Sequence, residues 1–229
     1  MTDIRLVLFD VDGVLLDSLA QHLKICEDKN REYGLGLRIP SVPEFRKIAL
    51  DGIKISPMED FFRAVGFPPE FAQKADAQYR EVFVRDYPVN VFPGVSEMLR
   101  ELLAHGIALG IVTSNVRENI KRALGPNMFL FRTDCVVTKS DAEHTSKADA
   151  IKLVLSRSMF QADQTMYIGD QLSDLHAARS AGVKFLGAVY GWGIKPDGSF
   201  PIVHNVTEIR NHVLTDSNCT GDIPRVALG

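Results

Sequence analysis

The chain has 229 residues, of which 45% are hydrophobic and 24% are charged, values that are ordinary for a globular protein. Its formal net charge of −3 gives no indication of a nucleic-acid or membrane partner. Cys26, Cys135 and Cys219 are far apart and odd in number, so they predict neither a disulfide framework nor a metal site, and a reducing compartment is expected.

The N-terminal segment, residues 1–9, does not have the pattern of a signal peptide. Its apolar run is short, and Asp10 and Asp12 follow at once. No later apolar stretch approaches the ~18 residues that are needed to cross a bilayer. We therefore predict a cytoplasmic protein.

Five short apolar runs predict β-strands. They cover residues 4–9, 107–112, 135–137, 166–168 and 184–189, and residues 200–203 form a possible edge strand. Runs that are apolar at successive positions suit strands buried on both faces, as in parallel sheets. Helical patterns lie between or after these runs, at residues 95–104, 149–155, 172–181 and 206–214. The alternation predicts an α/β fold with a Rossmann-like parallel sheet that helices cover on both faces.

Residues 18–90 interrupt this alternation with a segment that is entirely helical. Candidate helices cover residues 19–33, 43–50, 58–65 and 70–84, and prolines separate them. We interpret the segment as a helical cap domain inserted after the first strand, with hinges near Ser18 and Asn90. The core domain would then comprise residues 1–17 and 91–214, and residues 215–229 would form a loose tail.

Two carboxylates follow the first predicted strand. Asp10 and Asp12 lie at its carboxyl end, where ligands bind in open parallel sheets. One carboxylate can stay ionised beside a metal ion and act as a nucleophile, while the other gives a proton to a leaving oxygen. Gly13 would let the chain turn sharply after them. For this motif alone, simple turn capping remains an alternative.

Polar groups also follow the second predicted strand. Thr113, Ser114 and Asn115 offer a hydroxyl and the backbone N–H groups of a strand-to-helix turn, which together can bind phosphate. The same residue types are ordinary helix caps.

A second carboxylate pair, Asp170 and Asp174, follows the fourth predicted strand. Carboxylate oxygens are ligands that Mg²⁺ prefers, although either residue could instead cap a helix. A lysine could neutralise phosphate charge nearby. Lys147, at the start of a predicted helix, and Lys139, at the end of the third strand, are the candidates, and a solvated surface lysine is the alternative for each.

These four segments would meet at one edge of the sheet, and together they resemble the motifs of the haloacid dehalogenase-like (HAD) superfamily. Residues 9–18, FDVDGVLLDS, resemble its first motif, and Thr113, Lys147 and residues 169–174 resemble the next three in order. The resemblance spans residues 4 to about 193, including residues 92–95, which resemble the usual re-entry from a helical cap. It is strongest to phosphoglycolate phosphatase-like and β-phosphoglucomutase-like members with a helical cap.

The resemblance implies a Mg²⁺-dependent phosphatase that acts on a small phosphorylated metabolite. Asp10 would be the nucleophile and a metal ligand, and Asp12 the acid/base, with its backbone carbonyl also on the metal. Asp170 would complete the metal site, and Asp174 would orient it. Phosphoryl-binding and charge-neutralising roles would fall to Gly13, Thr113, Ser114, Asn115 and Lys147, and substrate contacts to His22, Lys24, Lys54 and Trp192.

The resemblance also separates three reactions. Dehalogenases of the superfamily lack the second aspartate, so Asp12 argues against dehalogenation. A phosphomutase remains an alternative, but its cap arginine is missing from residues 51–56, where only Lys54 is basic. His22 does not discriminate, because phosphatases and mutases share it. A non-catalytic binding or regulatory protein on the same scaffold is the third possibility.

Overall fold

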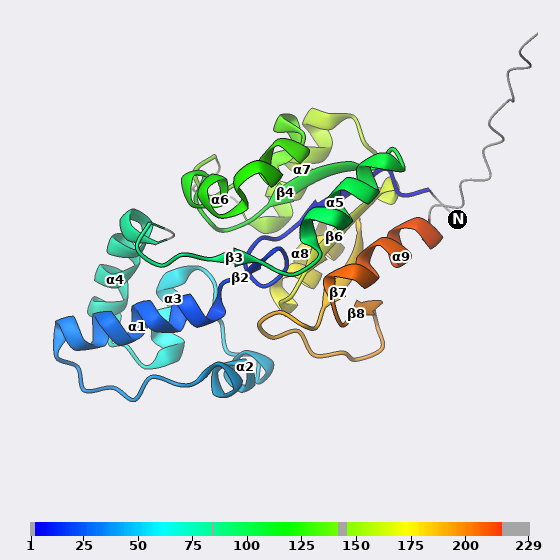
Figure 1. Ribbon diagram of the computed structural model, residues 1–229. Helices are drawn as coiled ribbons and strands as arrows, with labels where there is room; N and C mark the ends of the chain where they lie inside the picture. Colours follow the sequence, from blue (N-terminus) through cyan, green and yellow to red (C-terminus); the bar gives the residue numbers. More distant parts are fainter. Residues whose placement is uncertain (1–2, 84, 142–145, 217–229) are drawn as a thin grey trace, which may run out of the picture.

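The computed structural model describes residues 3–83, 85–141 and 146–216. It has two parts, an α/β core and a group of helices beside it, which we call the cap (Figure 1). The core contains a parallel sheet in the order β5-β4-β1-β6-β7-β8. These strands are β1 (Leu6–Phe9), β4 (Ala108–Val112), β5 (Val136–Val137), β6 (Thr165–Gly169), β7 (Lys184–Ala188) and β8 (Ile202–Val203).

Helices cover both faces of this sheet because its central strands are apolar on both sides. In β1, Leu6 and Leu8 pack into one buried cluster, whereas Val7 and Phe9 pack into another. The first cluster includes residues of α7 (Lys147–Ser158) and α8 (Leu172–Ala181). The second includes residues of α5 (Val95–Ala104), α6 (Arg117–Leu124) and α9 (Val206–Asp216). The connections also include short 3₁₀ turns at Gly125–Leu130, Thr133–Cys135 and Ala162–Gln164.

The cap consists of helices α1 (Leu19–Tyr33), α2 (Val42–Leu50), α3 (Met58–Val65) and α4 (Pro69–Val82). Aromatic side chains form its interior, including the buried Phe45, Phe61 and Tyr79. The chain enters and leaves the cap through a small antiparallel pair, β2 (Leu16–Asp17) and β3 (Asn90–Val91). This pair holds the two connecting segments side by side.

The structure confirms the predicted fold class. Helices α1, α3, α5 and α8 begin and end at the predicted residues. The sequence analysis did not predict helix α6. It also missed β2 and β3, since two-residue strands are too short to show a periodicity. Of the two positions predicted as hinges, Ser18 directly follows β2, and Asn90 is the first residue of β3.

The end of the chain and the thiols complete the comparison with prediction. Helix α9 continues to Asp216, so the first residues of the predicted loose tail are helical, and residues 217–229 lie outside the described residues. Cys26 and Cys135 are buried free thiols, whereas Cys219 also falls outside that part. Among the described residues, no helix combines the length and the apolar character that a membrane span requires.

Candidate active site

The site lies where β1 and β6 end side by side. Phe9 and Ile168 are register partners in this parallel pair, and the Asp10 amide donates to the Ile168 carbonyl at 2.9 Å. Asp10 and Asp170 therefore leave the sheet at the same edge. Neighbouring strand ends of this kind bring together groups that are 160 residues apart in sequence, as the motif order predicted.

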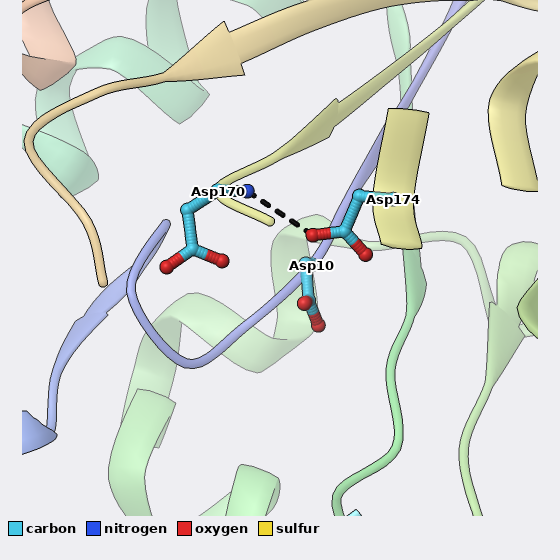
Figure 2. A group of neighbouring side chains, drawn as sticks. All are labelled: Asp10, Asp170 and Asp174. Atoms are coloured by element: carbon cyan, nitrogen blue, oxygen red, sulfur yellow. Dashed lines mark hydrogen bonds between the residues drawn. The ribbon is translucent and has the colours of Figure 1, made fainter. Parts of the chain in front are cut away.

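Three carboxylates converge at this edge (Figure 2). One oxygen from each of Asp10, Asp170 and Asp174 lies within 4.8 Å of the others, and all three residues are buried. Asp174 comes from the first turn of α8. Its Oδ2 accepts hydrogen bonds from the Asp170 and Gln171 amides at 3.1 and 3.0 Å, so it holds the β6–α8 turn in shape.

Burial of like charges makes this cluster electrostatically costly without a cation. Desolvation, followed by the charges of Asp174 and Asp10, raises the pKa of Asp170 well above its usual range. Its Oδ2 accepts from the Trp192 amide at 2.6 Å, whereas its buried Oδ1 has no partner among the described residues. An orphaned carboxylate oxygen beside two further carboxylates fits a hard divalent cation such as Mg²⁺.

Lys147 bridges two of the carboxylates. Its Nζ lies 2.6 Å from Asp10 Oδ2 and 2.5 Å from Asp174 Oδ1. Desolvation lowers the pKa of Lys147, but the charges of Asp10 and Asp174 outweigh it and raise that pKa well above the usual range. Lys147 begins α7, and Ser146 caps that helix through the Asp149 amide. This helix cap fixes where the lysine side chain starts, so the ammonium reaches Asp10.

Asp12 is oriented by one residue from each part of the molecule. Ser18, which precedes cap helix α1, donates from its hydroxyl to Asp12 Oδ1 at 2.7 Å. Asn115, which follows core strand β4, donates from Nδ2 to Asp12 Oδ2 at 2.8 Å. The backbone N–H of Asn115 in turn donates to Thr113 Oγ1 at 3.2 Å, which orients the threonine hydroxyl. Asp12 therefore lies between the cap and the phosphate-binding candidates.

Glycines create the space that the carboxylates occupy. Gly13 has a φ of +81°, and a Cβ there would lie 2.0 Å from Asp170 Oδ2. A Cβ at Gly191 would lie 2.5 Å from the same atom. Side chains at either position would collide with Asp170, so the two glycines permit its placement.

A cavity opens from these groups toward the cap. Its core wall includes Asp10, Asp12, Thr113, Ser114, Asn115, Lys139 and Lys147. Its cap wall includes apolar Ile55 and Met58 together with Asp76, Tyr79 and Arg80 from one face of α4. Such a concave site, with convergent polar groups and an apolar rim, is typical of a small-molecule site.

Comparison with known proteins decides the family. The family model described as haloacid dehalogenase-like hydrolase matches residues 7–188. The chain belongs to the haloacid dehalogenase-like hydrolases. A phosphoglycolate phosphatase from Pseudomonas fluorescens is 30% identical over 82% of this chain and 70% of its own length. An N-acetylmuramic acid 6-phosphate phosphatase from Pseudomonas putida is 27% identical over 90% of this chain and 95% of its own.

Solved structures of the family have the same fold. A haloacid dehalogenase-like hydrolase from Streptococcus pneumoniae superposes with a TM-score of 0.73 and 25% identity, covering 93% of this chain and 99% of that one. These comparisons confirm the predicted membership of the HAD superfamily and the predicted similarity to its phosphoglycolate phosphatase-like members. The named relatives are phosphatases, which agrees with the predicted class of enzyme.

The HAD motif residues and the predicted cap residues meet different outcomes. The structure brings Asp10, Asp12, Thr113, Ser114, Asn115 and Lys147 to one cavity, with Asp170 and Asp174 beneath it. Lys139, the rejected alternative to Lys147, also lines the cavity but makes no ion pair with a described residue. Gly13 is not among the lining residues, and its backbone amide donates to the Leu16 carbonyl at 3.0 Å. Its contribution is the space described above.

Of the four residues predicted to contact the substrate, two line the cavity and two do not. Lys54 is 74% exposed and pairs with Asp60 at 2.7 Å, away from the cavity. Lys24 pairs with Glu27 and Asp28 on the surface of α1. His22 and Trp192 do line the cavity. His22 is buried, its Nδ1 donates to the Ser18 carbonyl at 2.7 Å, and its Nε2 then accepts from the Tyr79 hydroxyl at 3.0 Å.

Sequence reasoning missed the polar face of α4. Asp76, Tyr79 and Arg80 lie at spacings of three and four residues, which place them on one side of a helix. That spacing was visible in the sequence, but nothing in it shows which face of a cap helix turns toward the core.

Proposed function

We propose that this protein is a Mg²⁺-dependent phosphatase that hydrolyses a small phosphate monoester through a phosphoryl group carried on Asp10. The observation that carries the proposal is the placement of the Asp10 carboxylate. It lies against Lys147, beside two further buried carboxylates, and opens to a cavity that also contains a hydroxyl and an amide. That arrangement offers a nucleophile, a cation site and phosphate ligands together.

The chemistry follows from the positions of Asp10 and Asp12. An Asp10 oxygen attacks phosphorus, the bond from phosphorus to the ester oxygen breaks, and Asp12 gives its proton to the leaving alcohol. Asp12, now a carboxylate, takes a proton from water, and the hydroxide attacks the same phosphorus. The bond to Asp10 breaks, and inorganic phosphate leaves. Ser18 and Asn115, which donate hydrogen bonds to the two Asp12 oxygens, would orient this carboxyl group for both proton transfers.

Asp10, Asp170 and the backbone carbonyl of Asp12 would hold the Mg²⁺ ion, with Asp174 orienting the site. The bound ion would supply positive charge to the phosphate oxygens and lessen their repulsion from the Asp10 carboxylate. The Lys147 ammonium, 2.6 Å from Asp10 Oδ2, would add further positive charge beside the phosphate oxygens. Thr113, Ser114 and Asn115 would position the phosphoryl group, since positioning and charge stabilisation supply most of the catalysis in phosphoryl transfer.

The relatives support a small phosphorylated metabolite as the substrate. They are named as phosphatases of phosphoglycolate and of N-acetylmuramic acid 6-phosphate, and a further relative from Oceanobacillus iheyensis is named as a pyrophosphatase. These substrates share a phosphoryl group and differ in the remainder of the molecule. The cap wall is therefore the part of this protein that would select the substrate.

The proposal is tested by Asp10→Asn. We expect phosphate release from a model aryl phosphate with Mg²⁺ to fall at least about 10³-fold, because the amide is a poor nucleophile. Asp163→Asn is the matched control, since Asp163 is exposed and precedes β6 at the far end of the sheet. Mass spectrometry of acid-quenched wild type should show one phosphoryl group on Asp10. Full activity of Asp10→Asn would refute the proposal.

A phosphomutase is the second candidate, and one observation favours it. The sequence argument against a mutase was the missing arginine at residues 51–56, yet the structure brings Arg80 into the cavity from another cap helix. A mutase would convert a hexose phosphate with dependence on a bisphosphate and with little release of inorganic phosphate. A purified protein inactive in both assays, on a broad panel of phosphate esters, would instead favour the non-catalytic alternative.

A further inference from the structure

Arg80 is a cationic group of the cavity that phosphoryl transfer, as described above, does not use. It belongs to cap helix α4, and its side chain remains 44% exposed while lining the cavity. The two lysines on the core wall of the cavity, Lys139 and Lys147, lie beside the phosphoryl-transfer groups instead. Lys147 is committed to Asp10 and Asp174, and the Lys139 amide donates to the Asn115 carbonyl, which places Lys139 beside the phosphate-binding candidates.

The Arg80 guanidinium is held in place on one side only. Its Nη2 donates to Asp76 Oδ2 at 2.7 Å, one turn earlier on α4, and the Asp76 residue is 8% exposed. The Arg80 guanidinium has no other hydrogen bond within the described residues. Arginine presents five N–H donors in a planar fork, so several remain for a ligand. A forked donor of this kind matches the two oxygens of a carboxylate or of a phosphate.

The two walls of the cavity would contact different ends of the substrate. The core wall carries the nucleophile and the phosphoryl ligands, so the transferred phosphoryl group faces the core. The remainder of the substrate must then face the cap wall, where Ile55 and Met58 are apolar and Arg80 is the basic residue. A carboxylate or phosphoryl group at that end could accept from the remaining N–H donors of the guanidinium, and a neutral group would match them less well.

We infer that Arg80 binds a second anionic group on the substrate. The substrate class is a phosphate monoester whose leaving group carries its own carboxylate or second phosphoryl group. This inference rests on the proposed function for the identity of the transferred group, and it adds the chemistry of the other end. Asp76 is then a positioning residue that fixes the guanidinium fork.

The first test compares two ligands that differ only in the second anion. Phosphonoacetate carries a phosphonate and a carboxylate, whereas methylphosphonate carries the phosphonate alone, and neither can be hydrolysed. Calorimetry with Mg²⁺ should show that wild type prefers phosphonoacetate, and that Arg80→Ala reduces this preference by about 10- to 100-fold, the range for a charge-assisted hydrogen bond. Methylphosphonate binding should change less than about threefold, since it makes no such bond.

Arg63→Ala is the matched control. Arg63 is also a cap arginine in an ion pair with an acidic residue one turn earlier, Glu59, and its side chain is 48% exposed, but it does not line the cavity. Its substitution should leave the preference unchanged. Arg80→Lys should restore the charge but only part of the preference, because a lysine cannot bind two oxygens as a fork.

Kinetics provide the second test. The ratio of kcat/KM for 2-phosphoglycolate over ethyl phosphate measures a carboxylate, and the ratio for a short diol bisphosphate over the same ester measures a second phosphoryl group. Arg80→Ala should lower at least one ratio by the same 10- to 100-fold, about the worth of one charged hydrogen bond.

Each alternative result has a distinct meaning. Equal losses on every ester, together with equal binding of both phosphonates by wild type, would overturn the assignment while leaving the phosphatase proposal intact. A preference lost in Lys139→Ala but kept in Arg80→Ala would move the anion site to Lys139 and also overturn it. Failure of the phosphatase proposal would appear separately, as full activity of Asp10→Asn. The binding measurement does not depend on turnover, so it tests Arg80 in either case.

Discussion

The core and the cap present polar groups to the same cavity in different ways. In the core, Asp170 and Asp174 are fully buried, and Lys147 contacts two carboxylates. In the cap, Arg80 is 44% exposed and is held by one ion pair. Groups that perform a covalent step need fixed geometry, and the strand ends of a packed sheet supply it. Groups that recognise a leaving group can sit on a separate helix, since they take no part in the covalent step.

Trp192 joins the two parts. Its amide donates to Asp170 Oδ2, and its indole packs edge-on against cap residues Phe61 and His22 with ring centroids 5.5 and 4.8 Å away. Nearby, the Arg46 guanidinium of α2 donates to the Tyr190 carbonyl at 3.1 Å. A change in the cap interior can thus reach the carboxylate cluster through one loop. How far the two parts are independent is therefore a measurable question.

Phe61→Ala is expected to have the largest effect on stability. Phe61 is fully buried and contacts the rings of Phe45, His22 and Trp192, so truncation should lower the free energy of unfolding by about 3–5 kcal/mol. Urea unfolding followed by circular dichroism measures the loss. Fluorescence reports on the cap–core junction, because Trp192 is the only tryptophan.

Phe129→Ala is the control for this prediction, since Phe129 is 92% exposed and its loss should leave stability nearly unchanged. If the two parts are separable, Mg²⁺ affinity of folded Phe61→Ala should match that of wild type. A parallel loss of Mg²⁺ affinity would show that the cap interior helps to shape the carboxylate cluster, and the contrast between the two parts would fail.

Gly13→Ala tests the core side of the contrast. The new Cβ would lie 2.0 Å from Asp170 Oδ2 at a backbone φ of +81°, so the carboxylate must move. We expect kcat/KM to fall by about 100-fold or more, because displacements near 1 Å are costly in an oriented site. Mg²⁺ titration should weaken in parallel.

Gly52→Ala provides the comparison for Gly13→Ala. Gly52 has a similar φ of +82° in the cap, but open space surrounds the position of its Cβ. Its substitution introduces the same backbone strain without the collision. If both variants lost activity equally, backbone strain rather than displacement of Asp170 would be the cause.

The sequence predicted the core site well because parallel-sheet geometry is simple. Once Asp10, Thr113 and Asp170 were placed after apolar runs, the sheet alone required them to share an edge. The residues alone left Lys139 and Lys147 both open, and the resemblance to the HAD motifs favoured Lys147. Here local pattern and tertiary placement are closely linked.

The helices of the cap could be predicted from the sequence, but not which of their side chains line the cavity. Lys54 was chosen by its position in the sequence, yet its ammonium pairs with Asp60, while Arg80 faces the cavity. Both are basic residues in a polar setting, and only the packing of four helices decides which one faces inward. Likewise, Tyr167 lies inside β6, and its hydroxyl donates to the Val112 carbonyl at 3.1 Å and lies 3.4 Å from Asp174 Oδ1, contacts that no spacing rule anticipates.

The smallest expected effect concerns the exposed polar network at the start of α2. A hydrogen bond from Arg38 at 2.6 Å, followed by bonds from the Ser41 amide and hydroxyl at 2.8 Å, lowers the pKa of Glu44 to about 2. An unfolded glutamate titrates near pH ~4.3. Because the folded pKa is the lower one, the ionised Glu44 stabilises the fold above pH ~4.3, and this contribution is lost as the pH falls toward about 2.

The urea midpoints of wild type and Glu44→Gln should accordingly differ most at pH 6 and converge as the pH is lowered from 4.5 to 3. The difference should be small and should shrink further in high salt, since Glu44 and Arg38 are exposed. Arg38→Gln, which removes the first-ranked bond, should give part of the same pH dependence. A midpoint difference that stayed constant from pH 6 to pH 3 would mean that packing of the longer side chain, not its charge, stabilises α2, and the cap would then depend on burial as fully as the core does.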